Sequence, residues 1–288
     1  MKKLTLVLFF ISLSALSYSQ SSTEIYLFNL NKTDSTFKLS NPINISDNIG
    51  YDNQPSFTGD GNAVLFASTR NDQTDILWYD IGSGSKTWIS DTPGGEYSPT
   101  LMPGGKHISA VRLDPDGLQL LYKYSIKTGE SEVLVPDLKI GYYTWFLTSK
   151  LIAFVLGEPA TIQEIDMVHN ETKSMYSNPG RSIHYIPNTK DYSFIDKSDS
   201  NDWKIKRAVP GNKEWTKEIT STLPGVEDMV WLDSSTIVMG KESKLFYFDT
   251  HNPSGGWNML ADLSEYKLEG ITRLAYHFNK LAVVIAGK

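Results

Sequence analysis

The sequence of 288 residues contains no cysteine. Disulfide bonds, thiolate catalysis and cysteine-ligated zinc or iron–sulfur centres are therefore excluded. Basic residues are in the minority, with 27 lysines and arginines against 33 aspartates and glutamates and a formal net charge of −6. Because a protein that binds nucleic acid needs a basic surface, we predict that this protein has no nucleic-acid partner.

The common catalytic and cofactor-binding motifs are also missing. The sequence has no H-E-x-x-H, no phosphate-binding G-x-x-x-x-G-K-[ST], no G-x-G-x-x-G between a strand and a helix, and no G-x-S-x-G. The segment "DPDG" at 114–117 lacks the spaced ligands and closing glutamate of a calcium loop, so it is predicted to be a turn. The five histidines show no metal-ligand spacing. We therefore predict no catalytic residue, no metal site and no cofactor.

The first residues have the pattern of a bacterial export signal. Lys2 and Lys3 precede the apolar run "LTLVLFFISLSAL", and the small residues Ser17 and Ser19 follow it. The pattern predicts a signal peptide over residues 1–19, and an uncleaved anchor helix is the alternative. No cysteine is available for lipidation, so the mature protein is expected to be periplasmic or secreted, without stable membrane insertion, and not a lipoprotein.

A repeat runs through the rest of the chain. "PSFTGDGNAVLFAS" at 55–68 aligns with "PTLMPGGKHISAVR" at 99–112, and weaker copies begin near residues 144, 184, 230 and 273. Each copy reads as a strand, a tight turn and a second strand. A third strand follows each of the first five copies, and most units add a fourth. Successive units start 41 to 46 residues apart. Four short strands in each forty-odd residues is the period of a propeller blade.

The two ends of the chain together supply the strands of one further unit. Residues 271–288 supply only two strands, and residues 23–50 supply two more with no hairpin before them. Together they make one blade, which would close the ring and remove free sheet edges. We predict an all-β, six-bladed propeller with four-stranded antiparallel blades, forming a single domain over residues 20–288. Its blades are expected at residues 51–96, 97–141, 142–182, 183–227, 228–270, and 271–288 with 23–50.

The run from Phe57 to Leu77, F-x-G-D-G-x-x-V-L-F-A-S-x-R-x-x-x-x-D-I-L, resembles the WD-repeat-like units of TolB-type six-bladed propellers. The resemblance is clear over residues 51–140. It implies a propeller fold and a place in the bacterial cell envelope. The first predicted strand follows the predicted signal almost directly, without the N-terminal domain of TolB proteins, so we expect a role other than that of TolB itself.

Polar and aromatic side chains gather at one predicted rim of the central channel. This rim is formed by the segments that enter the innermost strands and by the loops between second and third strands. The entering segments contribute Asp52, Asn53, Glu96, Tyr97, Tyr142, Tyr143, Arg181, His184, Glu227, Asp228, Glu269 and Arg273. The loops contribute Arg70, Asp72, Arg112 and Trp203. Concave sites with convergent polar groups commonly bind ligands, so we predict these residues as candidate ligand contacts.

Two explanations of this rim remain open at the sequence level. The residues could be polar because strand entries are exposed, with acid–arginine pairs locking neighbouring blades. Alternatively, they line a pocket, and the protein is a monomeric, non-enzymatic module that binds an envelope protein, a peptide or a small ligand. A metal-dependent hydrolase of lactonase type is the alternative function, with the acids Glu96, Glu227, Asp228 and Glu269 as oxygen ligands.

Overall fold

The computed structural model describes residues 22–33 and 36–287, so the predicted signal peptide lies outside the described residues. The described elements are β-strands and two short 3₁₀ helices, η1 (Pro253–Gly255) and η2 (Leu263–Tyr266). No helix in this part of the chain is long and apolar enough to span a bilayer. The prediction of an all-β fold is confirmed.

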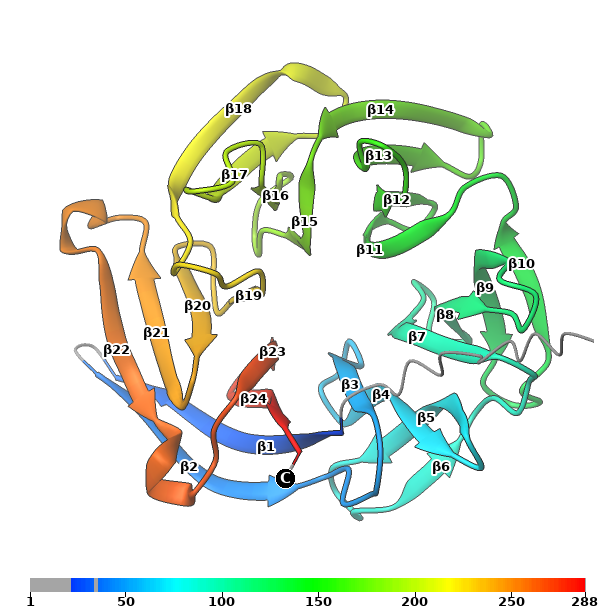
Figure 1. Ribbon diagram of the computed structural model, residues 1–288, viewed down its shortest axis with the longest axis horizontal. Helices are drawn as coiled ribbons and strands as arrows, with labels where there is room; N and C mark the ends of the chain where they lie inside the picture. The colour runs from blue at the N-terminus through cyan, green and yellow to red at the C-terminus, as the bar shows by residue number, and fades with distance from the viewer. Residues whose placement is uncertain (1–21, 34–35, 288) are drawn as a thin grey trace, which may run out of the picture.

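The strands form a ring around a central axis (Figure 1). One sheet combines both ends of the chain, in the order β2 (Phe37–Asn44), β1 (Thr23–Lys32), β24 (Lys280–Ala286), β23 (Ile271–His277). In each of three further sheets, neighbouring strands are consecutive in the sequence. They are β11 (Ile140–Leu147), β12 (Lys150–Val155), β13 (Thr161–Asp166), β14 (Glu171–Ser177); β15 (Pro179–Tyr185), β16 (Tyr192–Asp196), β17 (Lys204–Val209), β18 (Asn212–Ser221); and β19 (Met229–Trp231), β20 (Thr236–Lys241), β21 (Lys244–Asp249), β22 (Trp257–Asp262).

The remaining strands are joined in one eight-stranded sheet. Its members are β3 (Asp52–Phe57), β4 (Ala63–Arg70), β5 (Gln73–Asp80), β6 (Lys86–Trp88), β7 (Gly95–Leu101), β8 (His107–Leu113), β9 (Gln119–Ser125) and β10 (Ser131–Val135). Pairing within β3–β6 and within β7–β10 is antiparallel, whereas one parallel pair, Thr74 with Gly95, connects β5 to β7. The fold is thus a β-propeller built from four-stranded antiparallel units.

Local sequence explains the hairpins. In the turn between β3 and β4, the Asp60 carboxylate accepts hydrogen bonds from the Thr58 hydroxyl and the Asn62 amide. Gly61 adopts a φ of +71°, which a residue without a Cβ reaches at no steric cost. The segment 59–62, rich in glycine, aspartate and asparagine, therefore turns the chain as its composition predicts.

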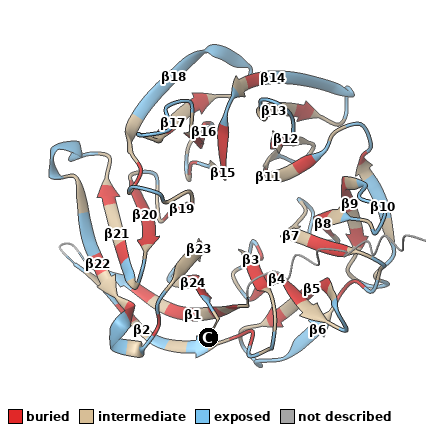
Figure 2. Cartoon of the chain, viewed as in Figure 1, coloured by how far each residue is buried: buried red, intermediate tan, exposed pale blue. Residues whose placement is uncertain are grey.

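The core lies between neighbouring sheets, where apolar faces of the middle strands pack together (Figure 2). β4 and β24 read as nearly continuous apolar runs, because both of their faces are covered. One cluster joins Phe28 of β1 and Val283 of β24 to Val238 of β20 and Leu245 of β21. The sheet that contains both chain ends therefore buries apolar side chains against a neighbouring sheet, as the other sheets do.

The innermost strands contain β-bulges that position the central side chains. Register shifts occur in β3, β7, β11, β15 and β23. In β3 the shift falls between Asn53 and Ser56, and in β7 it falls between Tyr97 and Thr100. Gln54 and Ser98, inside these bulges, have φ values of +58° and +52°. A bulge bends its strand and changes the direction of the side chains that follow it. The bulges thus affect which side chains of these strands face the axis.

Candidate functional site

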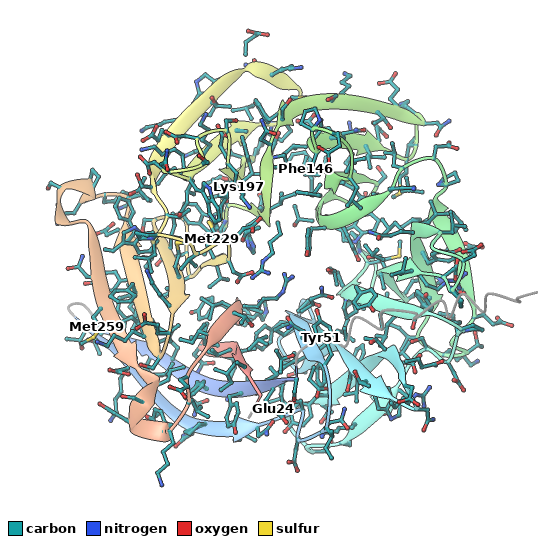
Figure 3. All side chains as sticks on the ribbon, viewed as in Figure 1. Glu24, Tyr51, Phe146, Lys197, Met229 and Met259 are labelled. Atoms are coloured by element: carbon teal, nitrogen blue, oxygen red, sulfur yellow. The ribbon has the colours of Figure 1, made fainter. Side chains whose placement is uncertain are left out.

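A cavity of about 380 Å³ lies where the innermost strands meet. Its lining draws on β3, β7, β11, β15, β19 and β23. Figure 3 labels Tyr51 and Met229 on the inner side of the ring, beside this central region. Of the residues predicted from the sequence, those that line the cavity are Tyr142, Tyr143, Arg181, His184, Asp228 and Arg273.

Two arginines flank one buried carboxylate in this cavity. Asp228 Oδ2 lies 3.9 Å from Arg181 Nε and 3.8 Å from Arg273 Nη1. The other oxygen, Oδ1, accepts a hydrogen bond of 2.8 Å from the backbone amide of Leu274. Burial raises the pKa of Asp228 to about 6, and the two guanidinium groups offset part of this increase. The carboxylate is therefore largely ionised above pH 6 and attracts both arginines.

Backbone and side-chain contacts fix the position of Arg181. Its Nη2 donates to the carbonyl of Thr272 at 2.7 Å, and its backbone amide donates to Glu227 Oε1 at 2.9 Å. Glu227 pairs with Lys197 at 3.1 Å, and the Lys197 ammonium lies 4.1 Å from the centre of the Trp203 ring. Glu227 and Trp203 thus support the cavity wall from outside its lining.

Tyrosines surround the Arg273 guanidinium. Arg273 lies over the ring of Tyr142, 5.1 Å from its centre, and Nη2 is 3.4 Å from the Tyr142 hydroxyl. Tyr51 contacts Tyr97 edge to face, with ring centroids 6.2 Å apart. Burial raises the pKa of Tyr51 to about 12, although the nearby Arg273 lowers it. The Tyr51 phenol is therefore neutral at physiological pH.

His184 and Tyr143 complete the polar lining in fixed orientations. His184 Nε2 is 2.9 Å from Ser182 Oγ, and burial lowers the pKa of His184 to about 4. The Tyr143 hydroxyl donates to the Ser98 carbonyl and contacts Ser109 Oγ at 2.8 Å. His184 is consequently uncharged at neutral pH, and Tyr143 ties β11 to the neighbouring sheet.

Several predicted rim residues lie inside the fold. Asp52 and Glu96 have no exposed surface, and Asn53 is 6% exposed. Asp52 accepts a hydrogen bond from the Ser68 hydroxyl, and Glu96 accepts from Ser90, Thr92 and Tyr124. Burial raises the pKa of Asp52 to about 6 and that of Glu96 to about 7. Asp52 and Glu96 therefore accept hydrogen bonds inside the fold, near the first residues of β3 and β7, and do not line the cavity as predicted.

Arg70 and Arg112 make structural contacts outside the cavity lining. Arg70 pairs with Asp75 at 2.8 Å and lies over the Trp88 ring. Arg112 pairs with Asp114 at 2.8 Å and stacks 3.7 Å from the centre of the Tyr122 ring. Each guanidinium thus binds the third strand of its own antiparallel unit.

Asp72 and Glu269 are exposed and do not line the cavity. Asp72 is an exposed turn residue between β4 and β5, with a φ of +62°. Glu269 is exposed and lines a separate pocket at the edge of the terminal sheet, together with Glu24 and Lys267. The sixteen predicted residues therefore divide into cavity-lining, supporting, buried and peripheral groups.

The cavity also contains polar residues that the sequence alone did not single out. They include Ser56, Ser98, Thr100, Thr144 and Ser182, which lie beside Gln54 of the predicted entering segment 52–54. Gln54 Oε1 accepts a hydrogen bond of 2.6 Å from the Ser98 amide, which joins β3 to β7. The aligned dipeptides Gln54-Pro55 and Ser98-Pro99 were the available signal, since proline inside a strand marks an edge or a bulge.

The four acids considered for a metal site do not converge. Glu96 hydrogen-bonds inside the eight-stranded sheet, Glu227 pairs with Lys197, Asp228 faces two arginines, and Glu269 lies at the terminal sheet. Among residues 22–33 and 36–287, no group of three or more histidine or acidic side chains has the proximity that a metal ion needs.

Comparison with known proteins defines the fold class. No protein-family model matches the chain, and no curated protein matches it in sequence. Among solved structures, TolB from Acinetobacter baumannii aligns with a TM-score of 0.61 and 14% identity over 82% of this chain. This chain covers 62% of that protein. A TolB candidate from Agrobacterium tumefaciens aligns with a TM-score of 0.68 and 12% identity, covering 93% of this chain and 99% of its own.

An oligogalacturonate lyase in complex with manganese is also similar, with a TM-score of 0.57, 12% identity, and coverage of 94% of this chain and 99% of the lyase. At these identities the likeness defines the fold and leaves the chemistry open. The protein therefore has a TolB-like propeller fold, as the repeat predicts.

Proposed function

We propose that this protein is an exported, non-enzymatic binding module of the bacterial cell envelope. Its central cavity would hold a loop of an envelope protein, a peptide or a small ligand. The observation that carries this proposal is the cavity itself, about 380 Å³ in volume and lined by polar side chains from β3, β7, β11, β15, β19 and β23. Concave sites of this size with a few fixed polar groups are typical of ligand binding.

We also infer that the two antiparallel halves of the eight-stranded sheet are separate blades, because one parallel residue pair connects them. The ring then has six blades, closed by the sheet that contains both chain ends. The export signal predicted over residues 1–19 and the likeness to TolB support a periplasmic or secreted location.

Binding is favoured over metal-dependent hydrolysis by the placement of the acids. A hydrolytic metal needs ligands that meet at one point, together with an open position for water. The carboxylates of Glu96, Glu227 and Asp228 instead contact a tyrosine, a lysine and two arginines respectively. This arrangement supports recognition by preorganised polar groups.

The substitution Thr144→Trp tests the proposal. Thr144 lines the cavity from β11, so the indole would fill space that a bound partner needs. The matched control is Thr216→Trp on the exposed strand β18. Both variants and the parent protein would be used to capture partners from an envelope extract of the producing bacterium. We expect Thr144→Trp to reduce capture at least about tenfold, as changes at the centre of an interface do.

The control should capture as the parent does, and thermal melting should show that both variants remain folded. Equal capture by Thr144→Trp and Thr216→Trp would remove the cavity from partner binding and overturn the proposal.

A further inference from the structure

The charged side chains that line the central cavity include more positive than negative groups. Its described lining contains the guanidinium groups of Arg181 and Arg273 and the carboxylate of Asp228. His184 is neutral, and Glu227 is paired with Lys197 outside the lining. The cavity thus carries one excess positive charge, although the whole sequence has a formal net charge of −6. In a partly buried site, where screening is weak, this charge favours an anionic group.

The arginines retain unused hydrogen-bonding capacity. A guanidinium has five N–H donors, and it binds carboxylates best through two parallel hydrogen bonds. The distances of 3.9 and 3.8 Å from Asp228 to Arg181 and Arg273 exceed those of such bonds. Arg181 Nε is buried and has no hydrogen-bond partner in the described part of the chain. Both arginines line the cavity, so the N–H donors that are not satisfied within the described part of the chain can bind a ligand that displaces Asp228.

The rest of the lining is suited to a ligand with a single negative charge. Around the arginines lie the neutral polar side chains of Gln54, Ser98, Thr100 and Thr144. Asp228 would repel a second negative charge on the ligand, because its carboxylate sits between the two guanidinium groups. The electrostatics thus favour a monoanion whose remaining atoms are uncharged and form hydrogen bonds.

We propose that Arg181 and Arg273 together bind the carboxylate of a small monocarboxylate ligand in the central cavity. This inference rests on the proposed function, since it specifies the chemistry of a ligand for the same site. The carboxylate accepts from both guanidinium groups, and the Tyr142 hydroxyl, which already contacts Arg273, borders the bound group. A sugar acid and the free C-terminus of a short peptide carry this same group, and matched probes distinguish them.

Isothermal titration calorimetry with two probe pairs tests the proposal. The first pair is D-galacturonate and D-galactose, and the second is N-acetyl-alanyl-alanine and its C-terminal amide. We expect one acid of these pairs to bind saturably, and its uncharged counterpart to bind at least about tenfold more weakly, since charge-assisted hydrogen bonds are lost. Which acid binds identifies the source of the carboxylate.

Variants of the charged residues link binding to the arginine pair. Arg181→Gln should weaken binding of the acid about tenfold or more, and Arg181→Lys should weaken it less, because lysine keeps the charge without the planar fork. Asp228→Asn should strengthen binding, because it removes the internal competitor while its amide oxygen can still accept from Leu274. Arg207→Gln is the matched control, since Arg207 pairs with Asp191 outside the cavity.

Circular dichroism and thermal melting would show that each variant is folded. The proposal is overturned if neither acid binds at concentrations up to about 10 mM. Equal binding of acid and uncharged counterpart, or unchanged affinity in Arg181→Gln, would overturn it as well. If Thr144→Trp abolishes partner capture while neither acid binds, the proposed function stands and the carboxylate inference fails. If acid binding depends on Arg181 but Thr144→Trp captures normally, the carboxylate site stands and partner capture uses another surface.

Discussion

Three buried carboxylates, those of Asp52, Glu96 and Asp228, lie at the first residue of an innermost strand or next to it. Burial raises the pKa of each, to about 6, 7 and 6 respectively. Hydroxyl groups or arginines compensate each carboxylate only in part. Since a buried charge lowers stability unless it is fully paired, these residues make the fold less stable at neutral pH than uncharged side chains would.

Glu96→Gln should therefore change how stability depends on pH. Below about pH 4.5 the carboxyl is protonated in both folded and unfolded states and has no effect. As pH rises toward 7, the unfolded chain releases this proton before the folded protein does, so the folded state loses stability, and the full loss is present above pH 7. We expect the variant to be more stable than the parent by about 1–3 kcal/mol at pH 8.

At about pH 5 most of this difference should disappear. Urea denaturation at both pH values measures it, and Glu214→Gln on the exposed strand β18 is the control. A variant less stable than the parent at pH 8 would show that ionised Glu96 is fully compensated by Tyr124, Thr92 and Ser90.

At the scale of elements, the bulges of β3 and β7 connect neighbouring antiparallel units. Gln54 accepts from the Ser98 amide at 2.6 Å across these strands, and Gln54 is half-buried. Gln54→Ala should lower the free energy of unfolding by about 1 kcal/mol, the net contribution of one hydrogen bond. Chemical denaturation measures the change. Gln163→Ala on β13 is the control, because the Gln163 amide donates to Thr161 of the same strand. An equal loss in both variants would mean that the contact between the strands contributes nothing specific.

The same elements show what could be predicted from the sequence. Strands and tight turns are local, so the repeated strand segments and the glycine-rich turn at 59–62 were sufficient to predict β3, β4 and the units that repeat them. The burial of Asp52 and Glu96 was not predictable in this way. A bulge shifts the register of pairing, and with it the face on which each side chain lies, and this shift depends on the partner strand.

The contacts within the candidate site also could not be predicted from local sequence. Arg181, Asp228 and Arg273 come from different sheets, and nothing in their separate sequence surroundings shows that both guanidinium groups lie within 4 Å of the Asp228 carboxylate. The repeat register placed all three at the axis because position within a unit is a local property. Their charge pairing depends on the angles between sheets, which packing of the whole ring sets.

At the scale of the whole molecule, we expect stability to depend on the sheet that contains both chain ends and closes the ring. β1 pairs with β24, and the Gly287 amide donates to the Ser22 carbonyl at 2.7 Å, so the described ends lie side by side. A circular permutant should therefore fold when a short glycine–serine linker joins residues 287 and 22 and new ends are placed between the exposed residues Pro136 and Asp137. We expect its free energy of unfolding to lie within about 2 kcal/mol of the parent's, because nearby termini tolerate permutation.

Deletion of residues 271–288 should have the opposite outcome. It removes β23 and β24, exposes the edge of β1, and takes Val283 and Ile285 out of the core cluster that contains Phe28. An uncovered apolar strand edge pairs with other chains, so the shortened protein should associate and lose its single cooperative unfolding transition. Light scattering and urea denaturation of both proteins distinguish the cases. If the shortened chain stayed monomeric and unfolded cooperatively, the ring would not depend on the sheet shared by its two ends, and each sheet would be stable on its contacts with one neighbour.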